Sequence, residues 1–167
     1  MTALISEDFL KEGKEQLNKT VGTEKKMTEG NYTNEAFHVL LVDDEYLIRS
    51  IVPKALTALG IRVDVAENGR QAQEKILSGS YDLVITDINM PEMNGLELLL
   101  WLKKHRPHIE GILMSGYDTT NRPFWEQLGG TTEFLSKPFP MVKLHEAVRR
   151  SMSRIVSREE KNPEKKV

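Results

Sequence analysis

The chain contains no cysteine, which excludes disulfide bonds and metal sites built on thiolates. It also lacks any apolar run near the roughly 18 residues that a membrane-spanning helix needs. Neither sign of charge is in clear excess, because 23 Lys and Arg residues stand against 25 Asp and Glu residues. Domains that bind nucleic acid are usually basic. We therefore expect a cytoplasmic protein that binds neither nucleic acid nor membrane.

The two ends of the chain have few apolar residues to bury. Residues 1–35 are polar, and we expect an N-terminal extension or linker that is partly disordered or forms a short helix. Its early acidic residues do not resemble a secretory signal. Residues 157–167 form a charged C-terminal tail, which is usually solvated. The remaining segment, 36–156, has the length of one ordinary domain.

Short apolar runs alternate with amphipathic segments throughout this central part. We expect strands over 37–42, 61–66, 81–87, 109–115 and 131–136, and helices over 45–59, 69–79, 96–106, 123–128 and 140–156. Such alternation is typical of parallel βα units, and five units are too few for an eight-stranded barrel. The second strand alternates apolar and polar residues, as an edge strand does. The alternation thus predicts an open, doubly wound (βα)5 fold in the α/β class with a five-stranded parallel sheet. Among the common orders of such sheets we assume the flavodoxin-like order 2-1-3-4-5.

Acidic residues end two of the predicted strands. Asp43 and Asp44 end the first strand, and Asp87 ends the third. In the predicted strand order, ligands bind at the carboxyl ends of the strands, between the first and the third. Three carboxylates gathered there would repel one another and raise each other's pKa values. A hard divalent cation that prefers oxygen ligands relieves this repulsion, which points to Mg²⁺ as a cofactor.

The other two central strands also end in polar residues. Ser115 ends the fourth strand, and Lys137 follows the fifth. A metal ion, an ammonium group and a hydroxyl around a carboxylate make a site for a phosphoryl group, whose transfer requires positioning and charge neutralisation. A carboxylate can act as the nucleophile and form an acyl phosphate. We expect Asp87 to be that nucleophile, with a backbone carbonyl near Asn89 reaching the metal ion.

Four motifs resemble the receiver domain of two-component response regulators. They read "LLVDDE" (40–45), "DLVITDINMPEMNG" (82–95), "ILMSGY" (112–117) and "FLSKPF" (134–139), and they occur in the family's order. The resemblance covers residues 36–156. No output module is recognisable after that segment, so we expect a single-domain receiver that acts alone or as a relay.

The resemblance implies specific roles for the residues at the strand ends. Asp87 would be the phosphorylated residue, and Lys137 would pair with its phosphoryl group through a loop whose bond to Pro138 is cis. Ser115 would bind a phosphoryl oxygen, and the ring of Phe134 would move inward on activation, so both are switch residues. The implied Mg²⁺ ligands are Asp43 (directly or through water), Asp44, Asp87 and the backbone carbonyl of Asn89.

The function implied by the resemblance is a phosphoacceptor signalling switch. A histidine kinase or a histidine phosphotransfer protein would donate the phosphoryl group to Asp87. The modified domain would then bind an unknown downstream protein through the face formed by 123–128, 131–136 and 140–156, and dimerisation is left open. Such a domain is not an enzyme for a separate substrate, because it catalyses only its own phosphorylation and dephosphorylation.

Other interpretations of the same residues remain open at this point. A Mg²⁺-dependent phosphohydrolase with an aspartyl-phosphate intermediate would use a similar site, although such hydrolases of the haloacid-dehalogenase type carry the nucleophile on the first strand. Asp87 on its own would suit a plain turn, and Asp43 or Asp44 would suit the cap of the helix that follows.

Overall fold

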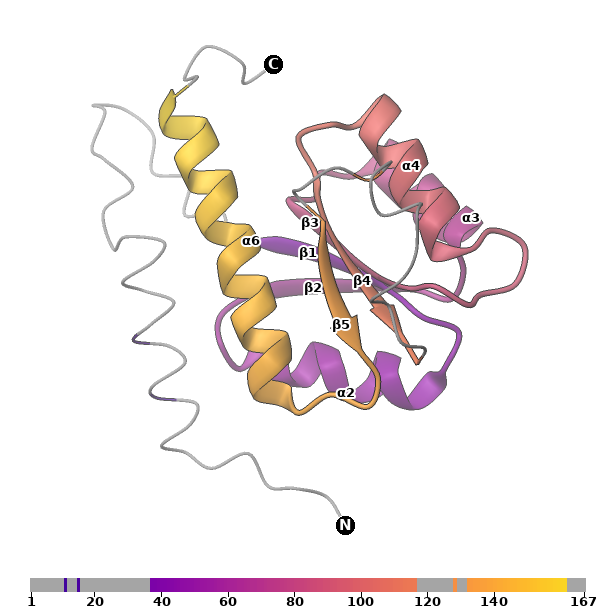
Figure 1. The fold of residues 1–167 in the computed structure, drawn as a ribbon, viewed down its shortest axis with the longest axis horizontal. Coiled ribbons are helices and arrows are strands. Elements are labelled where there is room, and N and C mark those ends of the chain that lie inside the picture. Colours follow the sequence, from indigo (N-terminus) through magenta and orange to yellow (C-terminus); the bar gives the residue numbers. More distant parts are fainter. Residues whose placement is uncertain (1–10, 12–14, 16–36, 117–127, 129–131, 162–167) are drawn as a thin grey trace.

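A computed structural model describes residues 37–116 and 132–161, together with the single residues 11, 15 and 128. In this part of the chain a 5-stranded sheet has the order β2-β1-β3-β4-β5, with every neighbouring pair parallel. Helices cover both faces of the sheet (Figure 1). The predicted fold class and strand order are confirmed.

The elements agree closely with the sequence periodicity. The strands are β1 (His38–Val42), β2 (Arg62–Ala66), β3 (Leu83–Asp87), β4 (Glu110–Ser115) and β5 (Glu133–Ser136). The helices in the described part of the chain are α2 (Tyr46–Thr57), α3 (Gly69–Ser78), α4 (Gly95–His105) and α6 (Met141–Lys161). The helix predicted over 123–128 lies outside the described residues, apart from Leu128, and so does nearly all of the predicted extension over 1–35.

Two hydrophobic cores lie on the two faces of the sheet. Alternate side chains of β1 enter opposite cores: Val39 and Leu41 lie in one, and Leu40 and Val42 lie in the other. Helices α2 and α6 close the first core, and α3 and α4 close the second; the helical residues include Leu56, Leu144, Ile76 and Leu98. Because both faces are covered, the central strands can be almost continuously apolar.

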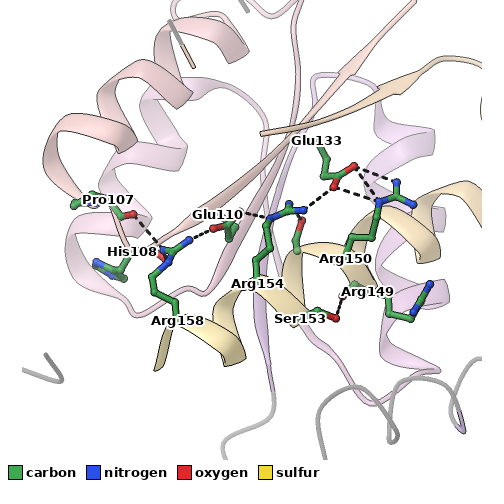
Figure 2. A network of polar contacts seen from close by, with 10 residues as sticks. Pro107, His108, Glu110, Glu133, Arg149, Arg150, Ser153, Arg154 and Arg158 are labelled. Atoms are coloured by element: carbon green, nitrogen blue, oxygen red, sulfur yellow. Dashed lines mark hydrogen bonds and ion pairs between the residues drawn. The ribbon is translucent and has the colours of Figure 1, made fainter. Parts of the chain in front are cut away.

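An alternating series of arginines and glutamates ties the second half of α6 to the sheet (Figure 2). Arg150 and Arg154 both pair with Glu133, at 3.1 Å and 2.7 Å, where β5 begins. Arg154 also pairs with Glu110 at 3.2 Å, where β4 begins, and Arg158 pairs with the same carboxylate. Glu110 is buried, so its charge needs these cationic partners.

The length of α6 corrects the predicted C-terminal boundary. The sequence predicts a charged, solvated tail over 157–167, but α6 continues to Lys161. The physical reason lies in Arg158, because its guanidinium pairs with the buried Glu110 and also donates to the backbone carbonyl of His108 at 3.2 Å. The charged residues 157–161 therefore form the last turn of α6, and Arg158 holds this turn against the sheet.

The ion pairs of Glu133 predict a stability loss in acid. Burial raises the pKa of Glu133, but the hydrogen bonds from Arg150 and Arg154 outweigh burial and lower it from its ordinary value of 4.5. A lowered folded-state pKa means that the contribution is complete above that ordinary value and disappears as the pH falls through the folded value. We expect Glu133→Gln to lower the free energy of unfolding by about 1–2 kcal/mol at pH 7.

Urea unfolding of both proteins between pH 7 and pH 3 measures this contribution. The difference between wild type and Glu133→Gln should shrink towards zero at the acidic end. A difference that stays constant over the whole range would contradict the assigned ion pairs. Glu146→Gln is the matched control. Glu146 also pairs with a cation, Lys143, but both residues lie on α6 and their ion pair is exposed.

Candidate functional site

Four polar residues lie at the carboxyl-terminal edge of the sheet. Asp43 follows β1 directly, Asp87 is the last residue of β3, Ser115 ends β4, and Lys137 follows β5. Parallel pairing brings these strand ends to the same edge, and Asp87 lies beside Met114 in the register of β3 and β4. The sheet thus gathers residues that are up to 94 positions apart in the chain.

The ammonium group of Lys137 is the centre of this group. Its Nζ atom lies 2.8 Å from Asp43 Oδ2, 2.9 Å from Asp87 Oδ1 and 3.1 Å from Glu45 Oε1. The Asp43 side chain has no exposed surface and the Asp87 side chain keeps 9 %, whereas that of Glu45 is 60 % exposed. An ammonium has three N–H donors, and here three carboxylates accept from it.

Backbone amides hold the second oxygens of the two buried carboxylates. The amide of Asn89 donates to Asp87 Oδ2 at 2.9 Å, and the amide of Glu45 donates to Asp43 Oδ1 at 2.8 Å. Both residues thus have one oxygen on Lys137 and one on a main-chain donor. Hydrogen bonds of this charge-assisted kind fix the direction of a carboxylate more strongly than neutral ones.

The electrostatics of the site follow from this geometry. Burial raises the pKa of Asp43, and the neighbouring Asp87 carboxylate adds to that effect, while Lys137 and the Glu45 amide oppose it. Burial alone would lower the pKa of Lys137, but its hydrogen bonds to Asp43, Asp87 and Glu45 raise it above its ordinary value. Lys137 is therefore a permanent cation between acids that repel each other.

The structure does not bring all the predicted metal ligands together. Asp44 is exposed, and among the described residues there is no group of three or more His, Cys, Asp or Glu side chains arranged to hold a metal ion. The convergence of Asp43, Asp44 and Asp87 on one metal ion therefore stays a prediction, and in the structure the Lys137 ammonium lies between Asp43 and Asp87. Asn89, predicted to offer its carbonyl to the metal ion, contributes its amide to Asp87.

The donor set nevertheless suits a hard divalent cation. Asp43 and Asp87 present carboxylate oxygens from adjacent strands, and Asp44 is the next residue on the loop after β1. Carboxylate oxygens are the ligands that Mg²⁺ prefers, and this ion keeps several waters and so needs few protein ligands. The residues present fit Mg²⁺ by the chemistry of their oxygen donors.

The remaining predicted residues have clear positions. Ser115 is buried at the end of β4, and its carbonyl accepts the amide of Lys137 at 2.6 Å. Phe134 is partly buried and packs against the core closed by α3 and α4. The bond between Lys137 and Pro138 is cis, as expected. The acids after β1 do not cap α2, because its N-cap is Glu45 and no side chain makes the capping bond.

Two residues that support the site were missed in the sequence. Glu45 stands in the motif "LLVDDE" as a third consecutive acid, a signal that could have suggested a further partner for Lys137. Gly95 begins α4, and its backbone passes very close to Asp87. A side-chain carbon built on Gly95 would lie 2.0 Å from the Asp87 carbonyl oxygen and 2.9 Å from Thr86 Oγ1.

Gly95→Ala should therefore damage both stability and the position of Asp87. The obstructing atoms belong mainly to the backbone of β3, which cannot turn away as a flexible side chain could. We expect the free energy of unfolding to fall by about 1–3 kcal/mol, in the range of overpacking mutations. Urea unfolding measures the change. Gly116→Ala is the control, since no described atom lies within 4 Å of its added carbon, and equal losses in the two variants would contradict the close contact.

A family model, curated relatives and solved structures all resemble this chain. A family model described as the response regulator receiver domain matches residues 39–149. The DNA-binding transcriptional regulator NtrC of Azospirillum brasilense is 35 % identical over 115 residues, which are 69 % of this chain but 24 % of that regulator. The chain thus spans about a quarter of the length of the curated relatives it matches first.

Solved structures match over nearly their whole length. A CheY-like response regulator receiver domain protein from Methanospirillum hungatei has a TM-score of 0.69 at 26 % identity, covering 74 % of this chain and 99 % of its own. The response regulator TrrA from Thermotoga maritima, in complex with Mg²⁺-BeF, has a TM-score of 0.63 at 35 % identity, covering 69 % and 98 %. Among the described residues of this chain, no helix has the length and apolar content to cross a membrane.

Proposed function

This chain belongs to the response regulator receiver domain family of two-component signal transduction, and from that membership we propose that Asp87 is its phosphoacceptor. One observation carries the assignment: the Lys137 ammonium contacts both Asp43 and Asp87 within 3 Å at the carboxyl edge of the sheet. A buried carboxylate beside a fixed cation is suited to accept a phosphoryl group, because the cation neutralises the charge that arrives.

The proposed reaction is a transfer between two nucleophiles. An oxygen of Asp87 forms a bond to phosphorus while the bond from phosphorus to the donor, a histidine nitrogen or an acetate oxygen, breaks. Lys137 moves part of its hydrogen bonding from the acids to a phosphoryl oxygen, and the Asn89 amide keeps the other Asp87 oxygen in place. The domain works on itself, so we do not propose turnover of a separate substrate.

Mg²⁺ is the proposed cofactor. Asp43, Asp44 and Asp87 would hold it with their carboxylates, and Asn89 with its backbone carbonyl. When bound, the ion neutralises the phosphoryl oxygens during transfer. Of these three carboxylates, Asp44 is the exposed one. The similar response regulator from Thermotoga maritima forms a complex with Mg²⁺-BeF, which supports the same ion here.

The proposed output is a change in a protein-binding surface. Ser115 and Phe134 lie on β4 and β5, two of the four strands whose ends form the site, and α6 packs beside β5. Ser115 would bind a phosphoryl oxygen, and Phe134 would follow it inward. The surface formed by residues 123–128, β5 and α6 would then change its affinity for a downstream protein.

A mass measurement tests this function. The wild-type chain, incubated with acetyl phosphate and Mg²⁺, should gain the mass of one phosphoryl group, and a chelator should prevent the gain. Release of phosphate from p-nitrophenyl phosphate with multiple turnovers would instead support the phosphohydrolase. No mass gain with acetyl phosphate or with a phosphorylated histidine phosphotransfer protein would overturn the proposal.

The surface beside the site favours a protein as the phosphoryl donor. Three large apolar side chains on the first turns of α2 are exposed: Tyr46 by 75 %, Leu47 by 67 % and Ile51 by 48 %. Tyr46 and Leu47 follow Glu45 directly in the chain, and Ile51 lies about one turn further along α2. We expect a protein donor at Asp87 to cover them. Grouped apolar side chains of this kind mark protein-binding surfaces more often than sites for small ions.

Leu47→Ser should therefore separate protein donors from small ones. Because burying a leucine contributes about 1.5–3 kcal/mol, transfer from a phosphorylated histidine phosphotransfer protein should slow about tenfold or more. Phosphorylation by acetyl phosphate should keep its rate. Leu77→Ser, an equally exposed leucine on α3, is the control and should change neither rate. Equal slowing with both donors would contradict a docking role for Leu47.

A further inference from the structure

Glu45 differs from the other two partners of Lys137. Asp43 and Asp87 are buried, whereas the Glu45 side chain is 60 % exposed and lies 3.1 Å from the ammonium, the longest of the three contacts. A carboxylate that is mostly in water can exchange an ammonium partner for water at little cost. Glu45 is thus the partner that Lys137 can release most easily.

Among the described residues, Lys137 is the partner that the Glu45 carboxylate contacts. Glu45 is the N-cap residue of α2, but its side chain makes no capping hydrogen bond. Its backbone amide, not its side chain, supports Asp43, at 2.8 Å from Oδ1. Within the described part of the chain, replacing the side chain therefore leaves the support of Asp43 intact and removes the contact with Lys137.

Arrival of a phosphoryl group forces a choice among the partners of Lys137. The three N–H donors of the ammonium match its three carboxylate partners, so a phosphoryl oxygen must displace one of them. Asp43 has no exposed surface, and leaving a buried carboxylate unpaired is costly. Asp87 is the residue being modified. Glu45 is the remaining partner, and water can replace Lys137 for it.

We propose that Glu45 is a positioning residue: it occupies the donor of Lys137 that a phosphoryl oxygen takes over when Asp87 is phosphorylated. This inference rests on the proposed function. Glu45 keeps the ammonium fully hydrogen-bonded and directed at the mouth of the site, and it competes with the incoming group. It thereby sets how readily the domain accepts a phosphoryl group, without touching the reacting atoms.

Acetyl phosphate is the probe for this competition. In the transfer, an Asp87 oxygen bonds to phosphorus, the bond from phosphorus to the acetate oxygen breaks, and acetate leaves as a carboxylate, so no proton is required. The rate of mass gain is compared at saturating Mg²⁺ in the wild type, Glu45→Ala, Glu45→Gln and Glu67→Ala. Glu67 is the matched control, because its side chain is 65 % exposed and pairs with Arg49 instead of Lys137.

The expected order of rates is specific to the hydrogen bond. An exposed ion pair of ordinary strength predicts that Glu45→Ala is phosphorylated about two- to five-fold faster than the wild type. Glu45→Gln should lie between them, since its amide oxygen still accepts but carries no charge. Glu67→Ala should match the wild type. An equally large increase in the phosphorylation rate of Glu67→Ala would overturn the inference. It would show that removing any nearby negative charge speeds reaction with an anionic donor.

A second measurement asks whether Glu45 acts through Lys137. In a Lys137→Met background, phosphoryl incorporation is followed over longer times, and Glu45→Ala should no longer raise its rate. The same fold increase with and without Lys137 would overturn the inference, as would a slower rate for Glu45→Ala in the wild-type background. Failure of the proposed function would look different, since then the wild type itself would gain no phosphate.

Discussion

The Asp87→Asn variant should gain no phosphate under conditions in which the wild type gains one phosphoryl group. An asparagine amide is a poor nucleophile, but it has nearly the same shape as the carboxylate that it replaces. It can still accept the Asn89 amide, which donates to Asp87 Oδ2 at 2.9 Å. The fold should therefore persist while the acceptor is lost. Intact-mass spectrometry after incubation with acetyl phosphate and Mg²⁺ measures the outcome.

Asp82→Asn is the matched control for this experiment. Asp82 lies at the opposite end of the same strand segment, where its carboxylate accepts the backbone amide of His38 at 2.9 Å. This variant should be phosphorylated like the wild type. If the Asp87→Asn chain gained one phosphate at the wild-type rate, the acceptor would be another residue, and fragmentation of the modified chain would identify it.

Removing the ammonium of Lys137 should lower both the stability of the domain and its rate of phosphorylation. Lys137→Met keeps most of the side-chain volume but leaves Asp43 and Asp87 facing each other without a cation. Breaking a buried ion pair by removing one partner costs about 3–5 kcal/mol, and we expect a loss of unfolding free energy at the lower end of that range. Phosphorylation should also slow strongly, because the Lys137 ammonium would no longer offset the repulsion between the two carboxylates and the negatively charged phosphoryl group.

Urea unfolding with a chelator and with Mg²⁺ tests the electrostatic origin of this loss. A divalent cation can replace the missing charge, so Mg²⁺ should restore more stability to Lys137→Met than it adds to the wild type. Lys143→Met is the control, since Lys143 is 61 % exposed and its ion-pair partner among the described residues is Glu146 on its own helix. A deficit that Mg²⁺ leaves unchanged would contradict the assigned role of Lys137 as the internal counter-ion.

Much of the candidate site could be predicted because its residues lie at the ends of parallel strands. The motifs end at strand termini, and parallel strands place their carboxyl ends at one edge. That rule was sufficient to bring Asp43, Asp87, Ser115 and Lys137 to the same edge from their positions in the sequence. The cis bond before Pro138 came from the family resemblance instead, and the structure agrees.

Contacts within the site were less accessible to sequence reasoning. Asp43 and Asp44 are identical neighbours in the motif, yet one side chain is buried on Lys137 and the other is exposed. Adjacent residues at a strand end point in different directions, and packing decides which of them turns inward. The approach of Gly95 to the Asp87 carbonyl likewise depends on how the loop after β3 folds back onto its own strand.

The amino-acid sequence by itself determined the alternation of strands and helices, the open parallel sheet and the edge at which the polar residues gather. The periodicity of apolar side chains and the handedness of βα units leave few other arrangements. Only the tertiary structure decided that Lys137 joins three acids, that Glu45 is one of them, and that α6 continues to Lys161. These features depend on distances of about 3 Å between elements far apart in the chain, and spacing along a sequence carries no such distances.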